Sequence, residues 1–382
     1  HIELGAAYQA VRGFASSQAM QAFERARELC AGSDEVEKLI DIQRGLYTGN
    51  YVRGQHRVSR AMAEEMLALG ARSADPSITN IARYLLGASL FWQGEFAGAA
   101  SAFTEVLASY DGGDAGAQRY EQLSLQIDPL VAVEFHHAWT LWMLGFPEQA
   151  WTMASRAVEL AEDKHQPLTL AMALFVLGAI HASSYSGRAH RGYLERLRTL
   201  TAEHDLAHPA ACAKFLVGQD LIARGDPAAG LEMIERGMRA FDEQEAGLGK
   251  PWGLSAAALA CLGLGELGRG LDIVAEALEL VERHGEYQWH AELHRVRALS
   301  LMARGDDDAG AERSLGTAID IACAQGARSL ELRARTTLAR LHRERGEADS
   351  ARELLAPTYA WFTEGFLIDD LKEAAVLLSQ LE

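Results

Sequence analysis

Apolar residues recur at three- and four-residue spacing along almost the whole chain, in runs long enough for helices. Ala99, Phe103, Val106 and Leu107 form one such stripe, and short polar segments separate it from the runs on either side. A stripe with this spacing buries one face of an amphipathic helix. The chain is also rich in Ala, Leu, Glu and Arg, has only 8 Pro, and contains few β-branched runs. This pattern favours helices over strands and predicts an all-α fold.

A glycine motif interrupts the apolar runs at regular intervals. It consists of a Gly, four mostly polar residues, and a small residue that opens the next run. The Gly can adopt the left-handed conformation that ends a helix, and the small residue lets the next helix pack closely. The motif occurs at Gly49 with Gly54, Gly94 with Ala99, Gly145 with Ala150, Gly187 with Gly192, Gly225 with Gly230, Gly265 with Gly270, Gly305 with Gly310, and Gly346 with Ala351.

The spacing of these copies indicates a repeat architecture. Successive intervals are 45, 51, 42, 38, 40, 40 and 41 residues, and a degenerate ninth copy lies near Gly13. Such a period is typical of helix-pair solenoids. We therefore predict a right-handed superhelical solenoid of about eight to nine tetratricopeptide-like helix pairs, forming a single domain over residues 1–382. The longest interval contains the segment from Asp111 to Asp128, which we expect to be an extended loop.

The last part of the chain is predicted to cap the stack. A solenoid must cover its final apolar face. After the last turn, residues 355–382 include Trp361, Phe362 and Phe366, and Asp369-Asp370 then opens a final helix. We expect the aromatic side chains of this cap to be buried.

Charge and cysteine content narrow the classes of function. The formal net charge is −17, which disfavours broad attraction to nucleic acid or to anionic membranes. The 4 Cys are far apart and suggest neither a metal site nor a disulfide framework, as expected in a reducing cytoplasm. We see no apolar run of the ~18 residues that span a bilayer and no basic-then-apolar leader. Because the sequence starts at His1, we expect it to be a segment of a longer polypeptide.

Several longer sequence segments resemble those of a known protein family. They are Trp142–Ala150, Val281–Gly285 followed by Trp289–Arg295, Ser329–Ala334, and Leu354–Phe366. Together they resemble the C-terminal tetratricopeptide-like repeat region of bacterial signalling proteins that join a class III adenylate cyclase, or another effector, to a STAND-type ATPase. The resemblance implies a sensing or docking module that follows upstream ATPase, cyclase or other effector domains in the full-length chain.

No ATPase or cyclase motif accompanies these repeats. The closest approach to a phosphate loop is the run from Gly247 to Pro251, which has Pro where a Mg²⁺-binding Ser or Thr belongs. A loop before a proline-started helix accounts for the run more simply. We therefore expect neither a cofactor nor enzymatic activity.

The candidate ligand-binding residues come from the concave face of the stack. In tetratricopeptide-like folds the first helix of each pair lines this face, and residues six, ten and thirteen before the turn glycine tend to point into it. The groove residues that we predict to bind a ligand are Tyr84, Trp92, Phe135, Trp139, Trp142, His181, Phe215, Gln219, Trp252, Arg295 and Arg340. The same projection gives Ser255, Leu259, Leu299, Arg333 and Thr336.

This mixture of aromatic and polar groups suits a peptide, a protein segment or a small aromatic or sugar-like ligand. Two simpler interpretations stay open. The aromatic residues can merely fill gaps between helices. The arginines between Arg328 and Arg345 can pair with neighbouring glutamates, among them Glu331, rather than hold an acidic tail or a phosphate.

Other candidate chemistry is weaker. His290 and His294 lie one helical turn apart and can share a face as zinc ligands do, but Ala291 stands where a metalloprotease needs Glu. No nucleophile, base and acid combination is evident. The leading interpretation is a ligand- or protein-binding sensor module of a bacterial signalling or transcriptional regulatory protein. The alternative is a protein–protein scaffold or a dimerisation module without a small ligand.

Overall fold

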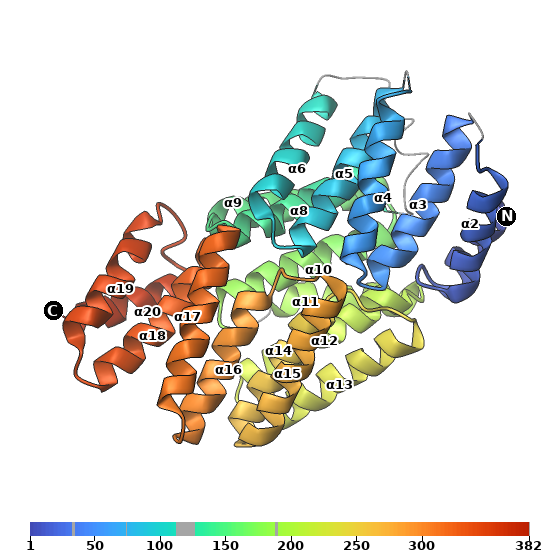
Figure 1. The fold of residues 1–382 in the computed structure, drawn as a ribbon. Helices are drawn as coiled ribbons and strands as arrows, with labels where there is room; N and C mark the ends of the chain where they lie inside the picture. The colour runs from blue at the N-terminus through green and yellow to red at the C-terminus, as the bar shows by residue number, and fades with distance from the viewer. Residues whose placement is uncertain (33–34, 74, 112–126, 188–189, 382) are drawn as a thin grey trace.

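In the computed structural model, which describes residues 1–32, 35–73, 75–111, 127–187 and 190–381, every regular element is a helix. Within these residues, nine successive antiparallel helix pairs and one further helix stack side by side (Figure 1). The predicted all-α superhelical solenoid of tetratricopeptide-like pairs is therefore confirmed. The loop predicted between Asp111 and Asp128 falls almost entirely outside the described residues.

The first helix of each pair forms the inner layer and the second forms the outer layer. The inner helices are α1 (Ile2–Arg12), α3 (Val36–Val52), α5 (Pro76–Trp92), α8 (Pro129–Met143), α10 (Pro167–Ser184), α12 (Ala207–Ala223), α14 (Lys250–Leu264), α16 (His290–Arg304) and α18 (Arg328–Glu344), followed by α20 (Asp369–Ser379). The outer helices are α2 (Ser17–Leu29), α4 (His56–Gly70), α6 (Phe96–Asp111), α9 (Pro147–Lys164), α11 (Arg191–Glu203), α13 (Pro227–Glu243), α15 (Leu267–His284), α17 (Asp308–Gln325) and α19 (Ala348–Trp361).

The turns within the pairs depend on glycine as the motif predicts, with one correction. At each of the eight turns from Gly54 to Gly346 the glycine has a φ between 73° and 92°, which a residue with a Cβ adopts only at a cost. The first turn glycine is Gly54, whereas the sequence pattern predicts Gly49. Gly49 lies inside α3, where the Met20 side chain packs directly against it. With Gly54 as the turn glycine, the interval to the next turn glycine, Gly94, matches most of the intervals between the later turn glycines.

Small residues also bring the two helices of a pair together. A Cβ added to Gly218 of α12 would lie 2.8 Å from the carbonyl oxygen of Gly230 in α13. The reverse substitution at Gly230 would place a Cβ 2.7 Å from the carbonyl oxygen of Gly218. Both contacts are closer than real Cβ atoms allow, so this pair requires glycine on both helices.

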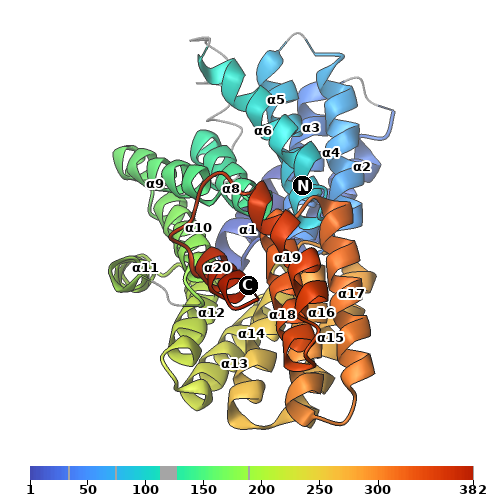
Figure 2. The same ribbon diagram turned by 90° about the vertical axis from the view of Figure 1, so that its left-hand side faces the viewer.

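The superhelix is wound so tightly that its later pairs contact its earlier ones. Figures 1 and 2 show the N-terminal helices lying against the helices from α14 onward. At these contacts, which we call the seam, a carbonyl at the end of an inner helix accepts a hydrogen bond from the start of the inner helix five pairs later. Three such bonds run from Gly247 N to Val52 O at 2.8 Å, from Gln288 N to Trp92 O at 3.0 Å, and from Ser329 Oγ to Trp142 O at 2.5 Å. The seam thereby satisfies helix-end groups that have no partner within their own helices.

A buried polar pair reinforces the seam. His56 Nε2 lies 3.3 Å from Glu286 Oε2, and both side chains are almost fully buried. The Glu286 carboxylate also accepts a hydrogen bond of 3.1 Å from Gly249 N, directly before α14. Gly247 lies so close to the opposite turn that an added Cβ would meet the Arg53 carbonyl oxygen at 2.3 Å. The glycine-rich run before Pro251 is therefore a close-packed seam contact.

The segment between α19 and α20 returns to the start of α9. The Glu364 carboxylate accepts hydrogen bonds from Glu148 N at 2.9 Å and Gln149 N at 3.2 Å, while Glu148 Oε1 accepts one from Gly365 N at 2.9 Å. A carboxylate that binds the first free N–H groups of a helix acts as a cap. The C-terminal segment thus caps a helix that precedes it by about 215 residues.

We expect Glu364→Ala to lower the free energy of unfolding by about 1 kcal/mol, as the loss of a helix cap does. Denaturant unfolding followed by circular dichroism measures this change. Glu353→Ala, at an exposed position of α19, is the control and should leave stability within about 0.5 kcal/mol. Equal effects of the two substitutions would show that the cap contributes nothing.

Helix α10 corrects one expectation about apolar runs. Its 18 residues, Pro167–Ser184, have a mean hydropathy of 1.6, so by length and composition it could cross a membrane. However, 72% of this helix is buried inside the protein. Its apolar character is explained by its position, because both its faces pack against neighbouring helices.

The C-terminal segment covers the end of the stack, but through fewer aromatic residues than expected. Phe362 is buried with Leu355, Leu371 and Leu377 in a cluster between α18, α19 and α20. Trp361 is 37% exposed and Phe366 is 46% exposed. Only one of the three aromatic residues assigned to the cap is therefore buried. The single-domain organisation with a cap at residues 355–382 stays a prediction.

Candidate functional site

Aromatic side chains fill the middle of the superhelix. The Trp139 ring of α8 lies 5.5 Å from Phe91, 6.1 Å from Phe175 and 6.2 Å from Trp252, measured between ring centroids. These partners come from α5, α10 and α14, so the cluster joins helices from different parts of the chain. Trp139 itself is 3% exposed.

This aromatic cluster buries many of the residues that the sequence predicts in an open groove. Seven of the predicted ligand-binding residues are at most 9% exposed and pack in the core: Tyr84, Trp92, Phe135, Trp139, Trp142, Phe215 and Trp252. The expectation of an aromatic groove open along the whole stack is therefore wrong for α5 and α8, which carry five of these residues. The physical reason is the tight winding, which brings the inner face of α8 into contact with those of α5 and α14, so that their side chains fill the space between them.

Several of these buried aromatic residues have their polar atoms satisfied internally. The Tyr51 hydroxyl accepts a hydrogen bond from Trp92 Nε1 at 2.6 Å and lies 2.9 Å from His136 Nε2. Nδ1 of His136 is 2.9 Å from the Ala132 carbonyl oxygen. Burial lowers the pKa of His136 to about 4, so the ring is neutral at physiological pH. The polar groups of Tyr51, Trp92 and His136 are therefore satisfied within the core and are not free to bind a ligand.

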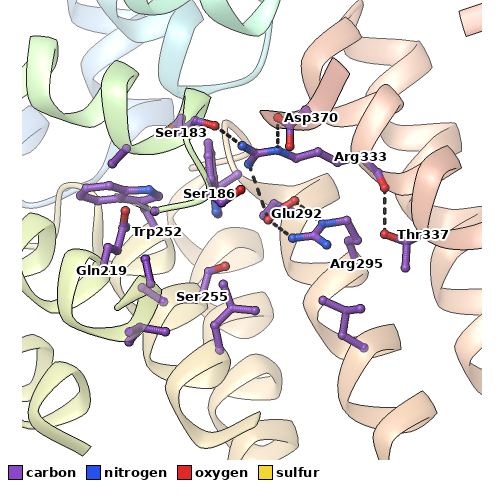
Figure 3. A pocket seen from close by; sticks show the side chains of 18 of the residues that line it. Ser183, Ser186, Gln219, Trp252, Ser255, Glu292, Arg295, Arg333, Thr337 and Asp370 are labelled. Atoms are coloured by element: carbon purple, nitrogen blue, oxygen red, sulfur yellow. Dashed lines mark hydrogen bonds and ion pairs between the residues drawn. The ribbon is translucent and has the colours of Figure 1, made fainter. Parts of the chain in front are cut away.

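A cavity of about 350 Å³ remains on the inner face, between α10, α12 and α14 on one side and α16, α18 and α20 on the other. Its volume is at the lower end of the range for ligand pockets. Figure 3 shows side chains from both sides pointing into it. The apolar part of the cavity wall is formed by Ile222, Leu259 and Leu299. The rings of Trp252 and Trp289 also line the cavity.

The charged side chains of the cavity form one paired network. Arg295 makes two bonds to the Glu292 carboxylate, at 2.6 and 2.8 Å. Arg333 donates to Asp370 Oδ2 at 2.8 Å and to the Ser183 carbonyl oxygen, and it lies 3.7 Å from Glu292 (Figure 3).

At the rim, Arg340 pairs with Glu373 at 2.9 Å. Three cationic and three anionic groups therefore line the cavity, and each has an opposite partner. The interpretation that the arginines of the cavity bind an acidic tail or a phosphate is not supported, because Glu292, Asp370 and Glu373 already neutralise them.

The pairing holds the deeper members of the network in their charged forms. Burial alone would raise the pKa of Glu292, but Arg295 and Arg333 lower it below its usual value. Burial likewise opposes the charged form of Arg295, and Glu292 reverses the effect, so the pKa of Arg295 is raised. Asp370 differs, because burial raises its pKa more than Arg333 lowers it.

Neutral polar groups on the same walls are less well satisfied. Thr336 is 5% exposed, lines the cavity, and its hydroxyl has no hydrogen-bond partner. The neighbouring Thr337 hydroxyl instead donates to the Arg333 carbonyl oxygen at 2.8 Å. The side chains of Gln219, Trp252 and Ser255 also line the cavity, and none of them forms a hydrogen bond with another described residue. A buried hydroxyl without a hydrogen-bond partner is costly and rare. These side chains are therefore free to form hydrogen bonds with a ligand.

The structure thus brings together only part of the predicted site. Gln219, Trp252, Arg295 and Arg340 line the cavity, as do the further projected residues Ser255, Leu259, Leu299, Arg333 and Thr336. His181 faces elsewhere, with its ring 5.5 Å from Trp151 and 4.6 Å from Tyr185. A role in ligand binding stays a prediction for all of these residues.

Sequence reasoning missed several polar residues that line the cavity, among them Ser183, Ser186, Glu292, Asp370 and Glu373. Asp370 and Glu373 belong to α20, a helix that the sequence predicts only as a cap. The turn-glycine projection had no glycine from which to count for that helix, so no signal pointed to them.

The histidine pair outside the cavity gives no metal centre. Nε2 of His290 and Nε2 of His294 lie 3.3 Å apart. Within the described part of the chain, no cluster of three or more His, Cys, Asp or Glu side chains has the arrangement of a metal site.

Comparison with known proteins adds information on the fold. No protein-family model matches the sequence, and no curated protein is similar to it. Among solved structures, a Rap protein complexed with competence and sporulation factor is similar over 100% of this chain and 98% of that chain, with 12% identity and a TM-score of 0.63. The Rap conjugation gene regulator of the plasmid pLS20, in complex with the Phr* peptide, covers 95% of both chains at 9% identity and a TM-score of 0.54.

The apo form of the quorum sensor NprR from B. thuringiensis is also similar, over 94% of this chain and 97% of that chain, with 10% identity and a TM-score of 0.52. At such low identities the likeness establishes a shared fold alone. The chain is therefore similar in fold, over nearly its full length, to tetratricopeptide-like regulators of the Rap and NprR type.

Proposed function

We propose that this chain is a peptide-binding sensor module of a bacterial signalling or transcriptional regulatory protein, and that the peptide occupies the cavity between α10–α14 and α16–α20. The observation that carries the proposal is the cavity itself, which lies on the inner face and is lined by a buried hydroxyl without a partner. Such a site offers apolar contacts together with free hydrogen-bonding groups, as peptide ligands require.

The solved structures of similar fold support this choice of ligand. The Rap protein was solved with competence and sporulation factor, and the pLS20 regulator with the Phr* peptide. NprR is described as a quorum sensor. A fold can host unrelated functions, so these names favour a peptide ligand and do not establish one.

The wider setting rests on sequence alone. The C-terminal phrases that resemble the STAND ATPase and cyclase fusions make an upstream effector domain part of the proposal. A reducing cytoplasm is its expected location, because Cys30, Cys212, Cys261 and Cys323 are all free thiols. We propose that the module binds and does not catalyse.

The proposal is tested by filling the cavity. Leu259 of α14 lines the cavity and is only partly buried, so Leu259→Trp places a larger side chain in the cavity, and circular dichroism checks that the variant keeps its fold. Pools of random pentapeptides carrying a methoxycoumarin fluorophore are titrated with purified protein, and binding is followed by fluorescence anisotropy. We expect the wild-type chain to bind and Leu259→Trp to weaken binding at least tenfold.

The matched control is Leu264→Trp, the same substitution at the 38% exposed end of the same helix. It should bind as the wild type does. If Leu259→Trp also binds normally, the ligand lies elsewhere. If no pool binds but light scattering shows a dimer or a larger assembly, the chain is a scaffold or dimerisation module instead.

A further inference from the structure

We infer that the cavity selects an uncharged peptide segment, held through its main-chain amides and small apolar side chains, and rejects segments that place an acidic, phosphorylated or basic group inside. This inference rests on the proposed function and specifies its ligand class. It follows from the contrast between the paired charges and the unpaired neutral groups of the same walls.

The first step concerns charge. Each cationic side chain of the cavity has an anionic partner, and Arg333 is held by three groups at once: Asp370, Glu292 and the Ser183 carbonyl oxygen. The side chains of Glu292, Arg333 and Asp370 are 4%, 11% and 16% exposed, so the network is largely shielded from water. A charged ligand group would have to break one of these pairs or stay unpaired in a desolvated site, and both are costly.

The second step concerns hydrogen bonding. The Thr336 hydroxyl is buried at the cavity wall without a partner. Gln219, Ser255 and the Trp252 ring lie on the facing helices α12 and α14 with their side-chain polar atoms unused by other described residues (Figure 3). Hydroxyl and amide side chains both donate and accept, which matches the alternating N–H and C=O groups of a peptide backbone.

The third step concerns shape. Leu259 and Leu299, with Ile222, supply the apolar part of the wall. A volume of about 350 Å³ accommodates a short segment and not a folded domain. Together the three steps describe a site for a few uncharged residues, with any charged residues of the peptide lying outside the cavity.

The test compares peptide pools that differ only in charge. Capped pentapeptides, acetylated or labelled with methoxycoumarin at the N-terminus and amidated at the C-terminus, carry no terminal charge. One pool contains only uncharged residues. Matched pools fix Asp, phosphoserine or Lys at each position in turn. We expect the uncharged pool to bind most tightly, with less than a twofold change in affinity between 50 and 500 mM NaCl, because salt screens only charged contacts.

Two neighbouring threonines provide a matched pair of variants. Thr336→Val keeps the shape but removes the unpaired hydroxyl, and it should weaken binding of the uncharged pool about fivefold, the usual effect of one neutral hydrogen bond. Thr337→Val removes a hydroxyl that already bonds to Arg333 within the helix, and it should bind as the wild type does. Circular dichroism confirms that both variants are folded.

The possible outcomes separate this inference from the proposed function. If a charged pool binds more tightly than the uncharged one, weakens with salt and is lost in Leu259→Trp, the site binds peptides but the inference about charge is wrong. Equal binding by Thr336→Val and Thr337→Val would likewise overturn the role of the free hydroxyl. If no pool binds in a manner sensitive to Leu259→Trp, both the inference and the proposed function fail.

Discussion

Replacing Trp142 with alanine is expected to lower the free energy of unfolding by about 3–5 kcal/mol, among the largest effects of any single substitution in this chain. The Trp142 ring is fully buried and stacks on Trp289 with 6.3 Å between centroids. The Arg333 guanidinium lies 5.1 Å above the same ring, and Trp142 Nε1 donates to Ser184 Oγ at 3.1 Å. The substitution would therefore open a cavity at the seam and remove contacts from both sides of it.

The measurement is denaturant unfolding followed by tryptophan fluorescence and circular dichroism. Trp361→Ala is the matched control, because it removes the same side chain from a position that is 37% exposed. Trp361 contacts Phe146 and Arg328, so its loss should cost only about 1 kcal/mol. If the two substitutions cost the same, the seam does not stabilise the fold as described.

The second large effect is expected for Arg333→Ala, which should cost about 3–5 kcal/mol because it leaves the largely buried Asp370 carboxylate without its partner. Arg333 is 11% exposed and neutralises Asp370, which is 16% exposed. Arg340 lies on the same helix as Arg333 and pairs with Glu373 of α20, and these two side chains are 42% and 48% exposed, so Arg340→Ala should cost no more than about 1 kcal/mol. Thermal and denaturant unfolding of the two variants measures the difference.

The effect of Arg333→Ala should also depend on pH. Burial already raises the pKa of Asp370, and Arg333 opposes that shift. Without Arg333 the pKa of Asp370 rises further, so the carboxyl becomes protonated at a higher pH and its burial no longer requires a partner. The stability gap between wild type and variant should be largest near pH 7 and should shrink as the pH falls through the pKa of Asp370 in the variant. A gap that stays constant with pH would contradict the assigned role of Arg333.

The repeat could be predicted from the sequence because its signal is local. Turn glycines with positive φ and amphipathic stripes recur with nearly constant spacing, and each can be recognised without knowledge of the rest of the chain. The one misplaced turn, Gly49 for Gly54, arose because two glycines five residues apart both fit the motif. Packing of Met20 against Gly49 decides between them, and the sequence does not reveal that contact.

The seam could not be predicted because it depends on how far the superhelix turns per pair. Val52 and Gly247 are joined by a hydrogen bond across nearly 200 residues, and no local pattern marks either one. For the same reason the sequence predicts Trp139 and Trp142 in an open groove, whereas the tight winding buries both.

The candidate site was partly within reach of sequence reasoning. Counting back from the turn glycines identified Gln219, Ser255, Arg295 and Thr336 because these residues belong to regular repeats, in which the inner face recurs at fixed offsets. Asp370 escaped because its helix, α20, has no turn glycine from which to count. Its presence changes the chemistry of the site, since it helps to convert a basic wall into a neutral one.

The most direct test of the account is to locate a bound peptide by photo-crosslinking. An uncharged, capped pentapeptide pool containing benzoylphenylalanine is irradiated with the wild-type chain, and mass spectrometry maps the labelled residues. We expect labels on the inner helices α12, α14, α16 and α18 around the cavity, and the loss of these labels in Leu259→Trp. Labels confined to the outer helices or to the ends of the stack, unchanged in Leu259→Trp, would contradict it.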